Sequence, residues 1–62
     1  MEFKDKRVYF AFRNNYLKHK SSSWNFFIED LNIGIICLDY YKDLYKIVDE
    51  KKWLLTKIKY GI

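Results

Sequence analysis

His19 and Cys37 are the residues whose types could form a pair of base and nucleophile. The chain has only one residue of each type, and no catalytic sequence signature surrounds either of them. A thiol becomes a strong nucleophile only when a neighbouring base or positive charge activates it. Cys37 lies in the apolar run 33–38, which indicates a small buried side chain. We therefore expect no catalytic residues and no enzymatic activity.

The chain also lacks the residues that binding of a metal, a cofactor or a phosphate group would require. One His and one Cys cannot supply the four ligands of a structural zinc site. The acidic pairs Glu29-Asp30 and Asp49-Glu50 are adjacent in sequence, whereas paired catalytic acids need opposed positions. Gly34 and Gly61 stand alone and cannot form a phosphate-binding loop. We expect no metal and no cofactor.

Aromatic residues are the chemically distinctive part of the chain. It contains 5 Phe, 6 Tyr and 2 Trp among 62 residues. A domain of this size buries only about 60% of the surface that its unfolded chain exposes. Some rings are therefore expected in an interface with a partner or a ligand, while other Tyr rings lie along the surface.

Basic and aromatic residues are interleaved in the N-terminal third, and the formal net charge is +4. Stacking rings between cations are what single-stranded nucleic acid or a nucleotide would use. The alternative is a solvated face, on which Tyr9 packs across a sheet and the cations keep the protein soluble. The candidate nucleic-acid or nucleotide face comprises Arg7, Tyr9, Arg13, Tyr16, Lys18 and Lys20.

The elements that position this face are predicted from the spacing of apolar residues. Residues 6–13 alternate, with Val8, Phe10 and Phe12 on one side, as in a strand with one buried face. Asn14-Asn15 is predicted to form a two-residue turn, because Asn tolerates positive φ. Residues 16–20 would then return as a second strand.

Residues 21–31 favour a helix. The run of Ser residues at 21–23 supplies an N-cap, and Asn32 or Gly34 can end the helix. The alternative is a strand, because residues 24–28 are rich in strand formers and two acids lie near the C-terminal end. One helical face would carry the apolar residues Trp24, Phe27, Ile28 and Leu31.

The C-terminal half is predicted to be mostly strand. Residues 33–41 are apolar on both faces, as expected of a central strand. Residues 44–48 and 53–60 resemble the two strands of a hairpin closed by the polar segment 49–52. The alternative is one long helix over residues 41–62, although Lys51 and Lys52 interrupt its apolar stripe.

Together these elements predict one compact α+β domain over residues 1–62. We expect a small antiparallel sheet of about four to five strands with one short helix packed on it. The alternative is a small all-β barrel. A single Cys excludes an intramolecular disulfide, and no apolar run is long enough to span a bilayer. These features favour the cytoplasm and argue against a membrane partner.

The predicted class of function follows from the small size of the chain, its composition and its lack of catalytic or metal-binding motifs. Residues with AT-rich codons, such as Lys, Ile, Tyr and Phe, far outnumber Gly, Ala, Arg and Pro. We predict a phage- or mobile-element-encoded binding protein that inhibits a host protein, such as a nucleic-acid-processing or defence enzyme, in the host cytoplasm. The alternative is a nucleic-acid- or nucleotide-binding module. We also expect a homodimer or larger oligomer, with Trp53 and Leu55 in a protein interface.

Overall fold

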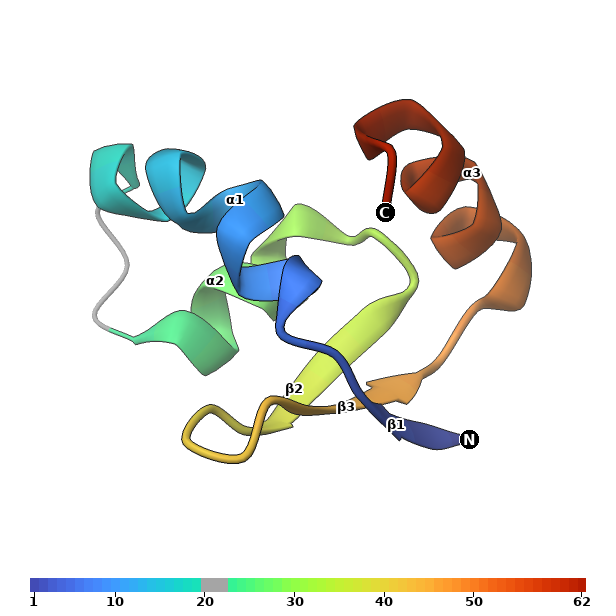
Figure 1. The fold of residues 1–62 in the computed structure, drawn as a ribbon, viewed down its shortest axis with the longest axis horizontal. Coiled ribbons are helices and arrows are strands. Elements are labelled where there is room, and N and C mark those ends of the chain that lie inside the picture. Colours follow the sequence, from blue (N-terminus) through green and yellow to red (C-terminus); the bar gives the residue numbers. More distant parts are fainter. Residues whose placement is uncertain (20–22) are drawn as a thin grey trace.

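The computed structural model describes residues 1–19 and 23–62, which form three helices and a three-stranded antiparallel sheet (Figure 1). In chain order the elements are β1 (Glu2–Lys4), α1 (Arg7–Lys18), α2 (Trp24–Leu31), β2 (Ile35–Asp39), β3 (Leu44–Ile47) and α3 (Glu50–Tyr60). The predicted α+β class is confirmed. The described residues hold more helices and fewer strands than predicted, and the barrel alternative is wrong.

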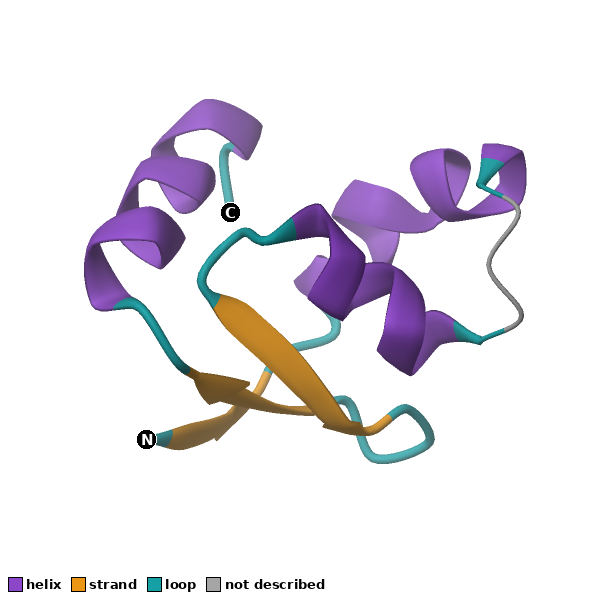
Figure 2. Ribbon diagram, turned by 180° about the vertical axis from the view of Figure 1, so that it is seen from behind, coloured by secondary structure: helices purple, strands orange, loops and turns teal. Residues whose placement is uncertain are grey.

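The sheet has the strand order β1-β3-β2, so β3 is its central strand. The prediction of a central strand at residues 33–41 is wrong, because β2 lies at an edge. In the strand register, Phe3 of β1 and Cys37 of β2 both lie opposite Tyr45 of β3, so the three side chains share one face of the sheet. That face packs against all three helices (Figures 1 and 2). The opposite face carries Glu2 beside Lys46 and has no helix over it.

One hydrophobic core lies between the helices and the sheet. Phe12 of α1 contacts Tyr60 of α3 with ring centroids 4.7 Å apart, and Phe3 of β1 contacts Trp53 of α3 at 5.8 Å. Each element therefore contributes to the same apolar interior. The buried hydrophobic residues are Val8, Phe12, Trp24, Phe27, Ile28, Ile35, Cys37, Tyr45 and Trp53.

Helix α1 replaces the predicted strand over residues 6–13, the Asn14-Asn15 turn and most of the second strand. Val8 and Phe12 are buried on one helical face, but Phe10 is 64% exposed. The alternation that grouped Phe10 with Val8 and Phe12 is therefore wrong, because an i, i+4 pair fits a helix as well as a strand. Lys20, the last residue of the predicted second strand, lies outside the described residues.

Helix α2 confirms the prediction for residues 24–31. The side chain of Ser23 accepts a hydrogen bond from the Phe26 backbone N–H at 3.3 Å, which caps the first turn. Asn32 adopts the left-handed conformation, with φ of 52°, and ends the helix. Trp24, Phe27 and Ile28 point into the core.

Helix α3 replaces the second strand of the predicted C-terminal hairpin, so that hairpin is wrong. Asp49 caps the helix by accepting from the Lys52 backbone N–H at 3.1 Å, and Gly61 ends it in the left-handed region. Glu50 in the first turn and Lys57 near the end both complement the helix dipole. The segment interpreted as a polar turn is thus the start of a helix.

Gly34 allows α3 to lie close to the start of β2. Its φ is +95°, and its carbonyl accepts hydrogen bonds from the Val48 and Asp49 backbone N–H groups at 2.9 and 3.1 Å. A Cβ at this position would lie 2.5 Å from both the Asp49 carbonyl oxygen and the Trp53 nitrogen. Only glycine fits both the conformation and the space.

Candidate functional site: an aromatic pocket between two turns

The turn that joins β2 to β3 presents several polar and aromatic side chains. One carboxylate oxygen of Asp39 accepts hydrogen bonds from the backbone N–H groups of Tyr41 and Lys42, at 3.0 and 3.2 Å. Asp43 adopts the left-handed conformation, with φ of 52°, and its N–H donates to the Tyr40 carbonyl at 3.3 Å. These bonds fix the backbone of the turn that carries Tyr40 and Tyr41.

The first turn of α1 faces this turn and is fixed by Asp5. The Asp5 carboxylate accepts from the Arg7 backbone N–H at 2.9 Å and forms a 2.8 Å salt bridge with the Arg7 guanidinium. The hydrogen bonds from Arg7 lower the pKa of Asp5. The Asp5 N–H donates to the Asp43 carbonyl at 3.1 Å, so a direct backbone bond holds the two turns together.

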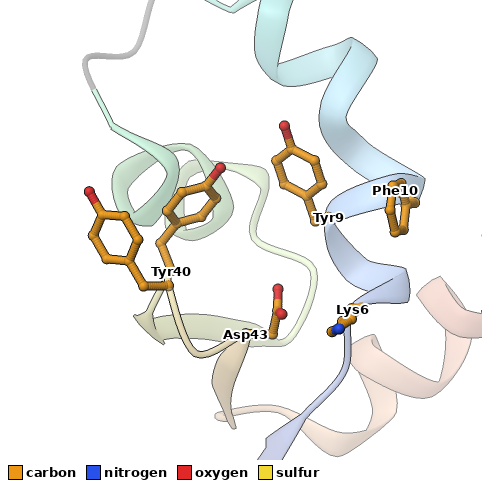
Figure 3. A pocket seen from close by; sticks show the side chains of 6 residues that line it. Lys6, Tyr9, Phe10, Tyr40 and Asp43 are labelled. Carbon is orange, nitrogen blue, oxygen red and sulfur yellow. The ribbon is translucent and has the colours of Figure 1, made fainter.

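A pocket of about 310 Å³ opens between the two turns (Figure 3). This volume is at the lower end of the range of roughly 300–1,000 Å³ found for small-molecule sites. The lining residues come from the first turns of α1 and from the β2–β3 turn. They are Lys6, Tyr9, Phe10, Tyr40, Tyr41 and Asp43.

The rings of the pocket contact one another and rest on the core. The Tyr9 ring lies 5.9 Å from the Tyr40 ring and 5.8 Å from the Phe10 ring, and Tyr40 lies 5.4 Å from Tyr41. The buried Trp24 contacts both Tyr9, at 5.2 Å, and Tyr40, at 6.2 Å. Tyr9 and Tyr40 are thus supported from behind by a core side chain, which limits how far they can move.

The lysine and the aspartate of the pocket, Lys6 and Asp43, form no salt bridge with each other. Among residues 1–19 and 23–62, the only salt bridge is that of Arg7 with Asp5. Asp43 is half-buried, and its side chain points toward the Tyr9 and Tyr40 rings (Figure 3). The hydrogen bond of Tyr40 with Tyr9 raises the pKa of Tyr40, and desolvation acts in the same direction. The pocket therefore brings together one aspartate, one lysine and the rings of three tyrosines and a phenylalanine.

The predicted nucleic-acid face is not assembled as predicted, because its strands are absent. Arg7 is engaged by Asp5, while the half-buried Tyr16 packs edge-on against Trp24 at 5.3 Å. The Arg13 guanidinium lies 5.8 Å from the centre of the Phe10 ring. Tyr9 lines the pocket, Lys18 lies at the end of α1, and Lys20 is outside the described residues. Binding of nucleic acid by this set stays a prediction.

Trp53 and Leu55 do not share a face in the structure. In a helix these two positions point in different directions, and Trp53 is 5% exposed whereas Leu55 is 67% exposed. The shared strand face on which the interface prediction was based is therefore wrong. Leu55 lies instead beside Leu54 and Ile58 on the outer face of α3, where all three side chains are exposed.

The two residues considered for nucleophilic chemistry lie in different surroundings. Cys37 is buried in β2, and burial raises the pKa of its thiol to about 11. His19 follows α1 and packs edge-on against Phe27 at 5.2 Å. In the part of the chain that the structure describes, no three His, Cys, Asp or Glu side chains come together as metal ligands would. None of the described helices is long and apolar enough to cross a membrane.

Sequence reasoning missed Tyr40, Tyr41 and Asp43 as a site. The available signal was the spacing of Asp39 and Asp43 around two Tyr residues, because Asp favours turns and tolerates the left-handed conformation. The prediction that some Tyr rings lie along the surface is confirmed by the exposed Tyr40 and Tyr41, but it did not say which rings these would be. Pairing this turn with α1 required the structure. No protein-family model, curated protein sequence or solved structure matches the chain.

Proposed function

We propose that this chain is a small non-enzymatic binding protein, encoded by a phage or mobile element, that inhibits a host protein by covering part of its surface. A nucleic-acid-processing or defence enzyme is the proposed class of target. The observation that supports this proposal is the outer face of α3. The strong AT-codon bias of the composition supports the proposed origin.

Helix α3 is apolar on two sides. Trp53 and Thr56 face the core, while Leu54, Leu55 and Ile58 on the other side are 58%, 67% and 71% exposed. A surface helix of a monomeric protein normally presents polar residues to solvent. Adjacent exposed aliphatic side chains on one helix suit insertion into an apolar groove of another protein.

The surroundings of this face are basic. Lys51 and Lys59 are exposed on the same helix, and Glu50 is its only acidic residue. A partner whose apolar groove has an acidic rim would complement this charge, whereas a basic partner would be repelled. We therefore propose a target with an acidic rim around the groove that accepts α3.

A second copy of the chain is the competing occupant of the α3 face. The predicted homodimer would place Leu55 in its interface, and it would also bring lysines of the two copies close together. Light scattering at high micromolar concentration separates the two cases. A mass near 7.7 kDa means that the face is free for another partner. A doubled mass that reverts in Leu55→Gln would assign the face to self-association.

The test compares α3 variants in binding to proteins of the host. The double variant Leu54→Gln/Ile58→Gln removes two exposed aliphatic groups and keeps good helix formers. Leu17→Gln, which alters a 77% exposed residue of α1, is the matched control. Wild type and control should capture the same host protein and inhibit it after purification, and the double variant should do neither. Equal capture and inhibition by all three proteins would refute the α3 proposal.

A further inference from the structure

We infer that the pocket between α1 and the β2–β3 turn binds an organic cation, either a quaternary ammonium group or a guanidinium group. The site is separate from the α3 face and comes from different elements. Its residues supply the two features that such cations require, electron-rich ring faces and a nearby carboxylate.

The ring geometry supports a cation. Tyr9 and Tyr40 meet at an interplanar angle of 57°, and Tyr40 and Tyr41 at 64°, so their faces are tilted toward one another rather than stacked flat. A cation within about 6 Å of several ring centroids is attracted by each ring. Phe10 already has a guanidinium, that of Arg13, 5.8 Å from its ring centre. One ring of this cluster thus already accepts a cation from the chain itself.

The pocket holds one ammonium group and one carboxylate, and the deeper burial of the carboxylate favours a cation over an anion. The Asp43 carboxylate is half-buried beside the rings, and the structure gives it no ion pair among the described residues. Lys6 is exposed on a flexible stem, so its ammonium group can turn toward solvent when another cation enters. The Asp43 backbone is fixed by the bond from the Asp5 N–H and by its own N–H bond to the Tyr40 carbonyl, and its shorter side chain has fewer rotatable bonds than that of Lys6.

The support behind the rings favours binding without rearrangement. Trp24 contacts Tyr9 and Tyr40 and is itself only 3% exposed. The Asp39 side chain fixes the backbone of the turn through its bonds to Tyr41 and Lys42. A pocket that is already ordered loses little conformational entropy when a ligand binds.

The test is a titration followed by amide NMR, with each cation compared with its neutral analogue. Choline is paired with 3,3-dimethylbutan-1-ol, in which carbon replaces the charged nitrogen. N-acetylarginine amide is paired with N-acetylcitrulline amide. A cation should bind with a Kd on the order of millimolar and shift the amide signals of Tyr9, Tyr40 and Asp43. Its neutral analogue should bind at least about fivefold more weakly.

The two cation arms distinguish the source of the ligand. Saturable binding of choline alone assigns the pocket to a small quaternary ammonium compound. Binding of the arginine amide alone assigns it to an arginine side chain presented by a protein. The inference is overturned if neither cation binds, or if the neutral analogues bind as tightly as the cations.

Two charge variants should change the affinity for a cation in opposite directions, and this pattern excludes an anionic ligand. Asp43→Asn should weaken cation binding at least about fivefold, because it removes the carboxylate. Asn also suits the left-handed backbone at this position, so the turn should remain intact. Lys6→Gln should strengthen cation binding, since it removes a competing charge. Control variants with the same charge changes elsewhere, Asp30→Asn and Lys51→Gln, should leave the Kd unchanged.

A nucleotide in the pocket would reverse these signs. AMP is the probe, and it would bind more weakly to Lys6→Gln and more tightly to Asp43→Asn. That pattern, together with no response to either cation, would overturn the inference and favour the nucleotide alternative. If the α3 variants still bound a host protein, only the proposed function would be refuted. The inference about the pocket would stand, because the pocket lies on a different surface from the α3 face.

Discussion

The indole N–H of Trp24 donates a hydrogen bond to the hydroxyl of Tyr45 at 3.1 Å, and both side chains are buried. Trp24 begins α2 and Tyr45 lies in the central strand, so this bond connects the helical layer to the sheet. The Tyr45 hydroxyl oxygen thus gives the buried indole N–H an acceptor inside an otherwise apolar core. Trp24 also supports the rings of the pocket, so the same residue serves the core and the candidate site.

Tyr45→Phe should lower the free energy of unfolding by about 1–3 kcal/mol, because it leaves the buried Trp24 N–H without its acceptor. Urea denaturation monitored by Trp fluorescence measures the change. Tyr60→Phe, which alters a 41% exposed residue, is the control and should change stability little. Equal stabilities of the two variants would mean that the buried hydrogen bond makes no net contribution.

Stability should fall as the pH rises above about 9. Burial raises the pKa of Cys37 from its ordinary value of 9.0 to about 11, and it also raises that of Tyr45. Between pH 9 and pH 11 the unfolded chain has released the Cys37 proton that the folded chain retains, which favours unfolding. Urea denaturation from pH 7 to 11 should show the decrease, and Cys37→Ala should make it shallower. A flat profile in wild type would contradict the assignment.

The Cys37 thiol should resist modification in the folded protein. The thiolate is the reactive form, and burial both shields the sulfur and raises its pKa. Reaction with a chromogenic disulfide reagent at pH 8 should be at least about tenfold slower in buffer than in 6 M urea. Similar rates in the two conditions would show that β2 opens readily at this edge of the sheet.

Gly34→Ala should lower the free energy of unfolding by more than about 2 kcal/mol, because the new methyl group clashes with the backbone of α3. Gly61→Ala is a matched control, since Gly61 also has a positive φ but a methyl group there would meet no atom within 4 Å. The control should cost only about 1 kcal/mol. Thermal denaturation of both variants measures the difference, and equal losses would refute the close approach.

The parts of the fold that could be predicted are those in which local signals agree. Ser23, the i, i+3, i+4 spacing after it and Asn32 all indicate α2, and the structure confirms that helix. For α3 the signals were also present, in Asp49 as a cap and Gly61 as an end, but the apolar spacing of residues 53–60 fitted a strand equally well. For α3 the capping residues were therefore more informative than the spacing of the apolar residues.

The failure at α1 has a different cause. Val8, Phe10 and Phe12 alternate perfectly, and only tertiary packing decides that Phe10 faces solvent while Tyr9 turns toward Trp24. The pocket could not be predicted for the same reason. Its two halves, near Tyr9 and near Tyr40, are far apart in the sequence, and no local pattern at either one indicates the other.

The strand order β1-β3-β2 also determines when the chain can fold during synthesis. β1 leaves the ribosome before the other five elements. Because Phe3 pairs with Tyr45, β1 has no partner until β3 has followed α1, α2 and β2. Trp53, which packs on Phe3, emerges later still. The first strand therefore has an unpaired backbone until residues 44–47 have emerged, and closing the sheet brings segments together that are far apart in the sequence.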